Sequence, residues 1–187
     1  MRSFSLRLFF SCLLTAVIFT IQVEAQNNQI RVSPKAWIGQ TIGFTDVNIV
    51  YSRPGVKGRT IWGELVPYNK VWRAGANEAT KITFSTDVII EGKKLAKGSY
   101  GFFAMPGEKE WTIIFNNVAD QWGAFEYNEA EDALRVKVKP QSTSNQEWLA
   151  YKIEKNGDAS AIISLEWEKV KVPIKVEGAA KDGKVKL

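Results

Sequence analysis

The chain has 187 residues with a formal net charge of +5, one cysteine and no histidine. The lack of histidine, with the single cysteine in an apolar run near the N-terminus, excludes a Ser-His-Asp triad and an ordinary zinc site. Basic and acidic residues are interspersed, so we expect a solvated surface and no nucleic-acid partner.

Residues 1–25 predict a secretory signal peptide. Arg2 and Arg7 precede an apolar run over residues 8–21, and the small-residue pattern Val23–Ala25 favours cleavage after Ala25. A retained anchor is the alternative, but the run is shorter than the roughly 20 residues needed to span a bilayer. We therefore expect an exported protein, periplasmic or extracellular, with no transmembrane segment after cleavage. Cleavage would leave 23 basic and 19 acidic residues and neither cysteine nor histidine, so no metal or cofactor is expected.

The rest of the chain predicts a polar leader (26–32), one β domain (33–177) and a flexible C-terminal tail (178–187). Apolar and polar residues alternate over residues 47–52, 134–139, 161–168 and 170–176, and glycine-bearing turns occupy residues 91–94, 105–110 and 155–159. This pattern predicts about nine strands in an all-β, antiparallel sandwich, jelly-roll-like or immunoglobulin-like. Residues 120–133 could hold one helical turn at most.

Between Ser52 and Glu78 the alternation lapses for about 25 residues, which is long for a connection within one domain. The segment is too apolar for a free loop, so we expect a cap packed on the sandwich. Packing would bring its arginines near Glu64 and Glu78. Two interpretations stay open: the arginines form internal salt bridges and bond loop carbonyls, or they converge on an anionic ligand beside tryptophans.

Two further segments carry polar groups. Asn77 and Glu78 are either part of a turn that precedes a strand or pocket groups for a polar ligand. Asp120 and Trp122 lie in a second irregular segment. Four tryptophans lie in strand patterns and are assigned to packing: Trp37, Trp111, Trp148 and Trp167. The candidate ligand-binding residues are Tyr51, Arg53, Arg59, Trp62, Trp72, Arg73, Asn77, Glu78, Asp120 and Trp122.

Three functions are consistent with these residues. The first is a binding module for an acidic glycan or another small anion. The second is a glycoside hydrolase that uses two carboxylates from Glu64, Glu78 and Asp120, although nearby arginines would disfavour the protonated acid that this chemistry needs. The third is a structural or protein-interaction module of the envelope with an unidentified partner. No catalytic residue is assigned, and the sequence favours a protein that is not an enzyme.

Three blocks carry a family resemblance: YSRPGVKGR (51–59), VWRAGANEAT (71–80) and DQWGA (120–124). With their surroundings, roughly residues 33–177, they resemble an exported bacterial family known as domain of unknown function 2911, common in Bacteroidetes-type bacteria. The resemblance implies an exported, β-rich single domain and no defined activity.

Overall fold

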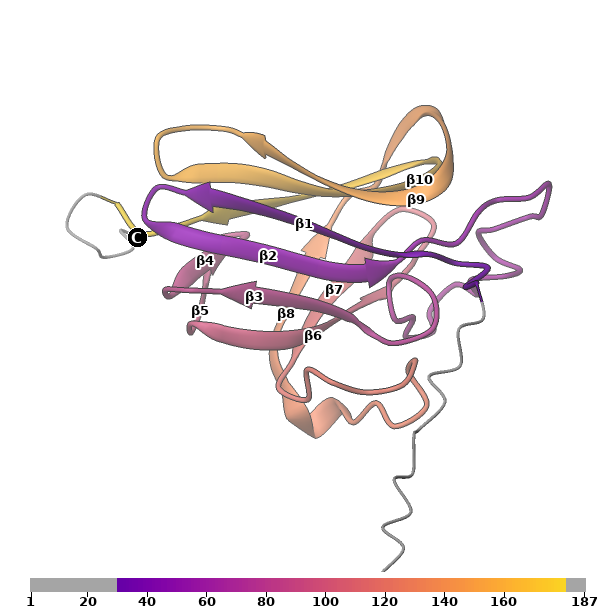
Figure 1. Ribbon diagram of the computed structural model, residues 1–187, viewed down its shortest axis with the longest axis horizontal. Coiled ribbons are helices and arrows are strands. Elements are labelled where there is room, and N and C mark those ends of the chain that lie inside the picture. The colour runs from indigo at the N-terminus through magenta and orange to yellow at the C-terminus, as the bar shows by residue number, and fades with distance from the viewer. Residues whose placement is uncertain (1–29, 181–187) are drawn as a thin grey trace, which may run out of the picture.

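The computed structural model describes residues 30–180, so the expected signal peptide, residues 26–29 and residues 181–187 lie outside the described part. Two antiparallel sheets pack as a sandwich (Figure 1). One sheet has the order β1-β2-β3-β6-β7-β8 and the other β5-β4-β10-β9. The strands are β1 (Lys35–Ile42), β2 (Thr45–Ser52), β3 (Thr80–Phe84), β4 (Val88–Ile90), β5 (Lys93–Leu95), β6 (Gly98–Met105), β7 (Trp111–Asn116), β8 (Asp132–Val138), β9 (Gln141–Lys155) and β10 (Ser160–Glu177). The predicted all-β sandwich is confirmed, with ten strands within residues 30–180 where about nine were expected.

Short turns with left-handed residues join several neighbouring strands. Ile42 pairs with Thr45, which leaves a two-residue turn that begins at Gly43 with φ +60°. Glu91 and Gly92 both have positive φ between the paired residues Ile90 and Lys93. Two-residue turns with positive φ match the twist of antiparallel strands, so they fix the register of these hairpins. The turns predicted at residues 91–94, 105–110 and 155–159 all lie between paired strands.

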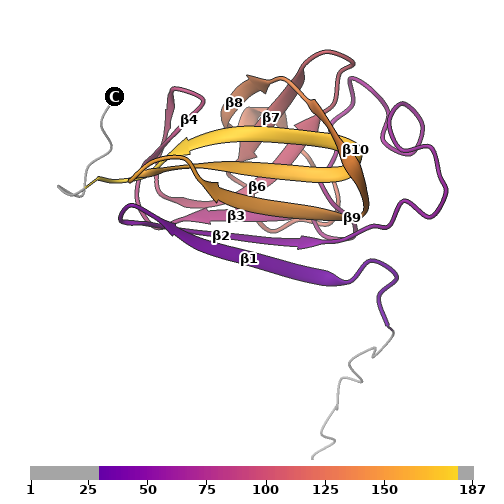
Figure 2. The ribbon, with the colours of Figure 1, turned by 90° about the horizontal axis from the view of Figure 1, so that it is seen from above.

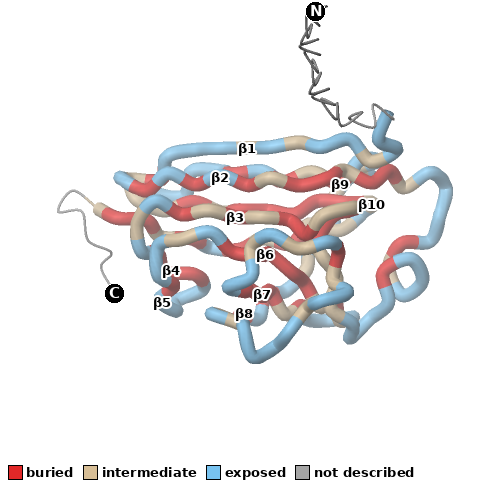
Figure 3. Tube along the Cα trace, turned by 60° about the horizontal axis from the view of Figure 1, so that its bottom comes forward, coloured by how far each residue is buried: buried red, intermediate tan, exposed pale blue. Residues whose placement is uncertain are grey.

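The core lies between the two sheets and follows the predicted alternation. In β2, Val47, Ile49 and Tyr51 are buried, and in β8 so are Val136 and Val138. Figure 3 shows the buried stretches running along the inner strands, whereas β1 at the edge of its sheet is largely exposed. A single 3-10 turn, η1 (Glu129–Glu131), lies in the segment over residues 120–133 and directly precedes β8, which fits the expectation of at most one helical turn there.

Strand β10 bends back on itself near Glu168. An extended strand of this length would span about 60 Å, yet Gly178 N, just after β10, donates to Ala159 O, just before it, at 2.7 Å. Glu168 has φ +55°, and the register with β9 shifts on both sides of it. Figure 2 shows the two halves of β10 as neighbouring runs. The bend explains why the apolar residues change from odd to even numbers between Trp167 and Val170.

The assignment of Trp37 to packing is wrong, because its side chain is 76% exposed. Its neighbours Ala36 and Ile38 are half-buried and pack on the core. Side chains alternate across a strand, so Trp37 on β1 points to the opposite, solvated face.

The described start of the expected C-terminal tail is packed. Ala179 is fully buried, its N–H donates to Thr45 Oγ1 at 2.8 Å, and its carbonyl accepts from Phe44 N at 2.9 Å. These bonds tie residues 178–180 to the turn between β1 and β2. Within residues 30–180, no helix has the length and apolar character needed to cross a membrane.

Candidate functional site

The loop between β2 and β3, residues 53–79, lies at one end of the sandwich (Figures 1 and 2). Isolated backbone bridges fasten it at three places. They pair Gly55 with Trp148 of β9, Trp72 with Ala104 of β6, and Glu78 with Trp122 of the segment after β7. The long connection is therefore packed on the sandwich, as its apolar composition predicts. The pairing at Glu78 also brings two of the predicted polar segments together.

Two of the three tryptophans kept as ligand candidates are partly buried and pack against the core. Trp62 packs edge-on against Trp111 and Trp167, with ring centroids 4.9 and 5.8 Å apart. Trp72 stacks on Trp167 at 5.9 Å, with an interplanar angle of 18°, and donates its indole N–H to Gly75 O at 3.1 Å. Trp122 is the exception, with 58% of its surface exposed.

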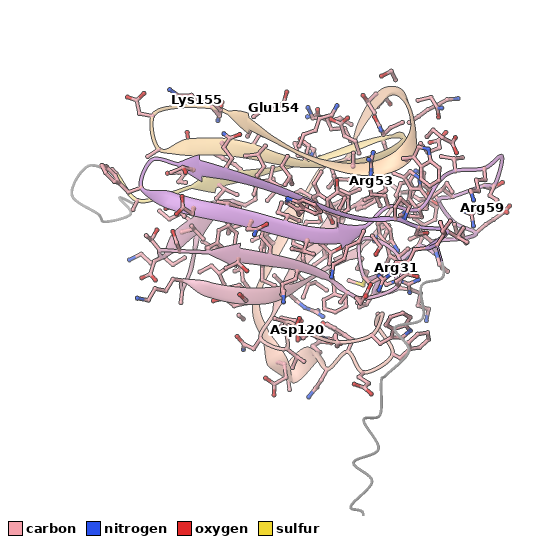
Figure 4. The ribbon with its side chains drawn as sticks, viewed as in Figure 1. Arg31, Arg53, Arg59, Asp120, Glu154 and Lys155 are labelled. Carbon is pink, nitrogen blue, oxygen red and sulfur yellow. The ribbon has the colours of Figure 1, made fainter. Side chains whose placement is uncertain are left out.

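Arg53 and Arg59 bond backbone carbonyls, as the structural interpretation of the loop predicts. Arg53 Nε donates to Leu149 O of β9 at 2.8 Å. Arg59 donates from Nε to Val56 O at 3.1 Å and from Nη2 to Gly55 O at 2.5 Å. Figure 4 shows both arginines at the loop end of the molecule. Neither forms a salt bridge with Glu64 or Glu78 among the described residues.

Glu78 pairs instead with Arg31, a residue of the polar leader that sequence reasoning did not single out. Two parallel bonds of 2.8 Å join Arg31 Nη1 and Nη2 to the two carboxylate oxygens. The bonds from Arg31 hold the pKa of Glu78 below its usual value. Asn77, in the left-handed conformation at φ +57°, donates its side-chain amide to Ser33 O at 3.3 Å. Both contacts fasten residues 31–33 across the loop.

Arg73 differs from the other two loop arginines because it has no salt bridge and no side-chain hydrogen bond within residues 30–180. Its Nε is buried without a partner. Burial lowers the pKa of this guanidinium, although the group stays charged at neutral pH. A Cβ atom placed on Gly123 would lie 3.4 Å from Arg73 Nη1, so the guanidinium lies close to the segment after β7.

Arg73 lines a cleft of about 340 Å³ that three cationic side chains and no carboxylate share. The other two cations are Lys57 and Arg59. Lys57 also lies over the Trp148 ring, with Nζ 5.7 Å from the ring centroid. The rest of the lining is polar and apolar: Val32, Ser33, Pro54, Gly55, Leu65, Val66, Trp72, Gly75, Ala76, Asn77 and Trp167. Trp167 is 1% exposed, and its indole N–H has no hydrogen-bond partner in the part of the chain that the structure describes.

A second cleft, of about 230 Å³, contains Tyr51, Glu78 and Asp120. Asp120 accepts from Lys81 Nζ at 2.7 Å, so both carboxylates of this cleft are already ion-paired. Tyr51 is buried, and its hydroxyl accepts from Tyr151 N at 3.3 Å. Because the lowered pKa keeps Glu78 ionised, it does not meet the need of glycoside hydrolysis for a protonated acid.

Seven of the ten predicted site residues thus divide between the two clefts. Arg59, Trp72, Arg73 and Asn77 line the first, and Tyr51, Glu78 and Asp120 line the second. Arg53, Trp62 and Trp122 belong to the lining of neither. No group of three or more acidic or other metal-ligating side chains within the described residues is placed to hold a metal ion.

Comparison with known proteins assigns the domain. No curated protein and no solved structure matches the chain. The family described as "Protein of unknown function (DUF2911)" matches over residues 33–176, which include both sheets except Glu177 and the lining of both clefts except Val32. The chain therefore belongs to the DUF2911 family.

Proposed function

We propose that this protein is a binding module for a small anionic ligand and that the cleft around Arg73 is its binding site. The observation that carries the proposal is the half-buried Arg73 in the lining of a cleft that contains two more cations and no carboxylate. Its Nε is buried and has no hydrogen-bond partner within residues 30–180. The cation-lined cleft thus has the charge that an anion requires.

Electrostatics gives the physical reason. A buried charged or hydrogen-bonding group without a partner destabilises a fold, so such groups are usually paired. Arg73 would gain partners from a bound carboxylate or phosphate, whose oxygens fit the fork of a guanidinium. Lys57 and Arg59 add positive potential that attracts the ligand into the cleft.

The other two candidate functions receive less support. The hydrolase alternative requires a protonated acid, and the carboxylates of the second cleft are ion-paired. The structural alternative accounts for Arg53 and Arg59, whose bonds fasten the loop. It leaves Arg73 unexplained. In this proposal the loop has a structural role and a binding role. Arg53 and Arg59 stabilise the packed loop, and Arg73 binds the ligand.

The signal peptide expected over residues 1–25 supports the further proposal that this binding activity is outside the cytoplasm, in the periplasm or the extracellular space. The proposed ligands are accordingly small anions available there, such as an acidic glycan fragment or another small carboxylate or phosphate.

A thermal-shift screen tests the proposal. The purified protein is heated with sodium phosphate, acetate, benzoate or glucuronate at constant ionic strength, with chloride as reference. A ligand at 100 times its Kd adds about 2.7 kcal/mol, which corresponds to a rise in Tm of roughly 5–10 °C for a protein of this size. Arg73→Gln should abolish the shift. Lys94→Gln, which removes an exposed charge from β5, should retain it.

Two outcomes of the screen would contradict the proposal. In one, no anion shifts Tm; in the other, Arg73→Gln shows the same shift as the unchanged protein. Either result would return the loop to a purely structural role.

A further inference from the structure

The polar lining of the Arg73 cleft offers many hydrogen-bond donors and few acceptors. Lys57, Arg59 and Arg73 can only donate. Asn77 already uses its amide N–H₂ on Ser33 O, so its side-chain oxygen and the Ser33 hydroxyl are the acceptors that the lining side chains contribute. A sugar carries several hydroxyls, and each needs an acceptor when buried. The lining therefore suits an acceptor-rich group and not a polyol.

The remaining lining is apolar and aromatic. Trp72 and Trp167 lie nearly parallel at 5.9 Å, and both contribute to the cleft. Val32 and Leu65, also in the lining, are 74% and 45% exposed. A ligand with a flat apolar body would cover Val32, Leu65 and the exposed part of Trp72, and would remove this apolar surface from water. The volume of about 340 Å³ lies at the small end of ligand pockets, so the body is limited to roughly one ring.

The cationic side chains are not equivalent as ligand anchors. Arg59 already directs Nε and Nη2 to carbonyls. Lys57 is a point charge that lies over Trp148. Of the two guanidinium groups in the lining, that of Arg73 is the one without a hydrogen bond to another side chain or carbonyl within residues 30–180. One planar fork fits one planar, two-oxygen group. A carboxylate has this geometry.

We infer that the ligand is a monocyclic aromatic carboxylate, of the benzoate and phenylacetate class. The carboxylate would bond Arg73, and the ring would lie against the tryptophan and aliphatic side chains of the cleft. This inference rests on the proposed function, because it names the ligand class of the same site. It also narrows that proposal, since it favours a hydroxyl-poor anion over an acidic glycan.

Isothermal titration with four matched probes tests the inference. Phenylacetate carries both the carboxylate and the aromatic ring, whereas glucuronate carries the carboxylate on a polyol body. The third probe, 2-phenylethanol, has the ring without a charge, and inorganic phosphate has charge without a ring. We expect phenylacetate to bind at least about tenfold more tightly than glucuronate or phosphate, and phenylethanol to give no measurable binding. A tenfold ratio corresponds to about 1.4 kcal/mol.

A variant at the rim of the cleft separates ring contacts from charge. Leu65→Ser changes an exposed residue, so folding should be retained. It should weaken phenylacetate several-fold and leave phosphate unchanged. Equal weakening of both probes, or none of either, would overturn the aromatic-body inference.

The titrations distinguish failure of this inference from failure of the proposed function. If glucuronate or phosphate binds as tightly as phenylacetate and Arg73→Gln abolishes that binding, the ligand class is wrong and the anion site stands. If no probe binds, or if Arg73→Gln changes no affinity, both are wrong.

Discussion

Replacement of Arg73 by methionine should stabilise the folded protein while it removes anion binding. Arg73 Nε is a buried donor without a partner, and such a group is unfavourable by about 1–3 kcal/mol. The side chain is only half-buried, so about 1 kcal/mol is the appropriate estimate. Methionine has similar length, carries no charge and adapts to irregular spaces. A gain of about 1 kcal/mol corresponds to a Tm rise of roughly 2–4 °C.

Differential scanning calorimetry in chloride buffer, without other anions, measures this effect. Arg53→Met is the matched control, because the same substitution there removes the bond from Nε to Leu149 O. Loss of a hydrogen bond from a charged group should destabilise the control by about 2 kcal/mol. The two variants should therefore shift Tm in opposite directions. A fall in Tm for Arg73→Met as large as that for Arg53→Met would refute the reasoning and make Arg73 a structural staple.

Three further predictions concern stability. The side chain of Asp132 is 7% exposed and accepts hydrogen bonds from Tyr127, Asn116 and Arg135. Asp132→Asn should therefore lower the free energy of unfolding, measured in urea, by about 2–3 kcal/mol. A loss under about 0.5 kcal/mol would contradict this prediction. Glu168→Gly should stabilise by about 0.5 kcal/mol, because φ +55° disfavours residues with a side chain; calorimetry would contradict this if Tm fell. The lowered pKa of Glu78 contributes stability that is complete above the unfolded value near 4.3 and is lost as pH falls through the folded value. The stability difference between the unchanged protein and Glu78→Gln should therefore stay under about 1 kcal/mol at pH 6 and shrink toward pH 3, and a difference that grows with acid would refute it.

The contacts made by the loop at the end of the sandwich explain why this connection contains so many charged residues. Arg53 and Arg59 satisfy carbonyls that irregular backbone leaves open. Arg31 and Asn77 hold residues 31–33 beside the loop, and Val32 and Ser33 become part of the Arg73 cleft. The bond to Arg31 also gives Glu78 a partner other than Arg73. The cleft thereby keeps its positive charge.

Much of the fold could be predicted from local sequence pattern. The alternation in β2 and β8 identified buried residues because one face of each strand meets the core. Turn residues such as Gly92 and Gly157 marked hairpins because positive φ favours glycine. Even the bend in β10 left a trace, since the predicted alternation changes phase between residues 168 and 170.

The pairing of side chains in the site could not be predicted in the same way. Arg31 and Glu78 are 47 residues apart, and an ion pair between distant segments leaves no periodic pattern. Arg53 and Arg59 bond carbonyls, which every residue possesses, so the sequence contains no sign of these partners. Trp37 was misassigned because alternation defines two faces of an edge strand without showing which one is covered. Long-range packing decides all three.

The most direct test of the central claim is an NMR titration that follows the Nε–H signals of the arginine side chains while phenylacetate is added. Arg73→Lys, which lacks this Nε–H, assigns the signal. The account predicts that the Arg73 signal moves and saturates, whereas the signal of Arg53, already bonded to Leu149 O, stays in place. An unmoved Arg73 signal, or equal unsaturated drifts of all arginine signals, would contradict the account.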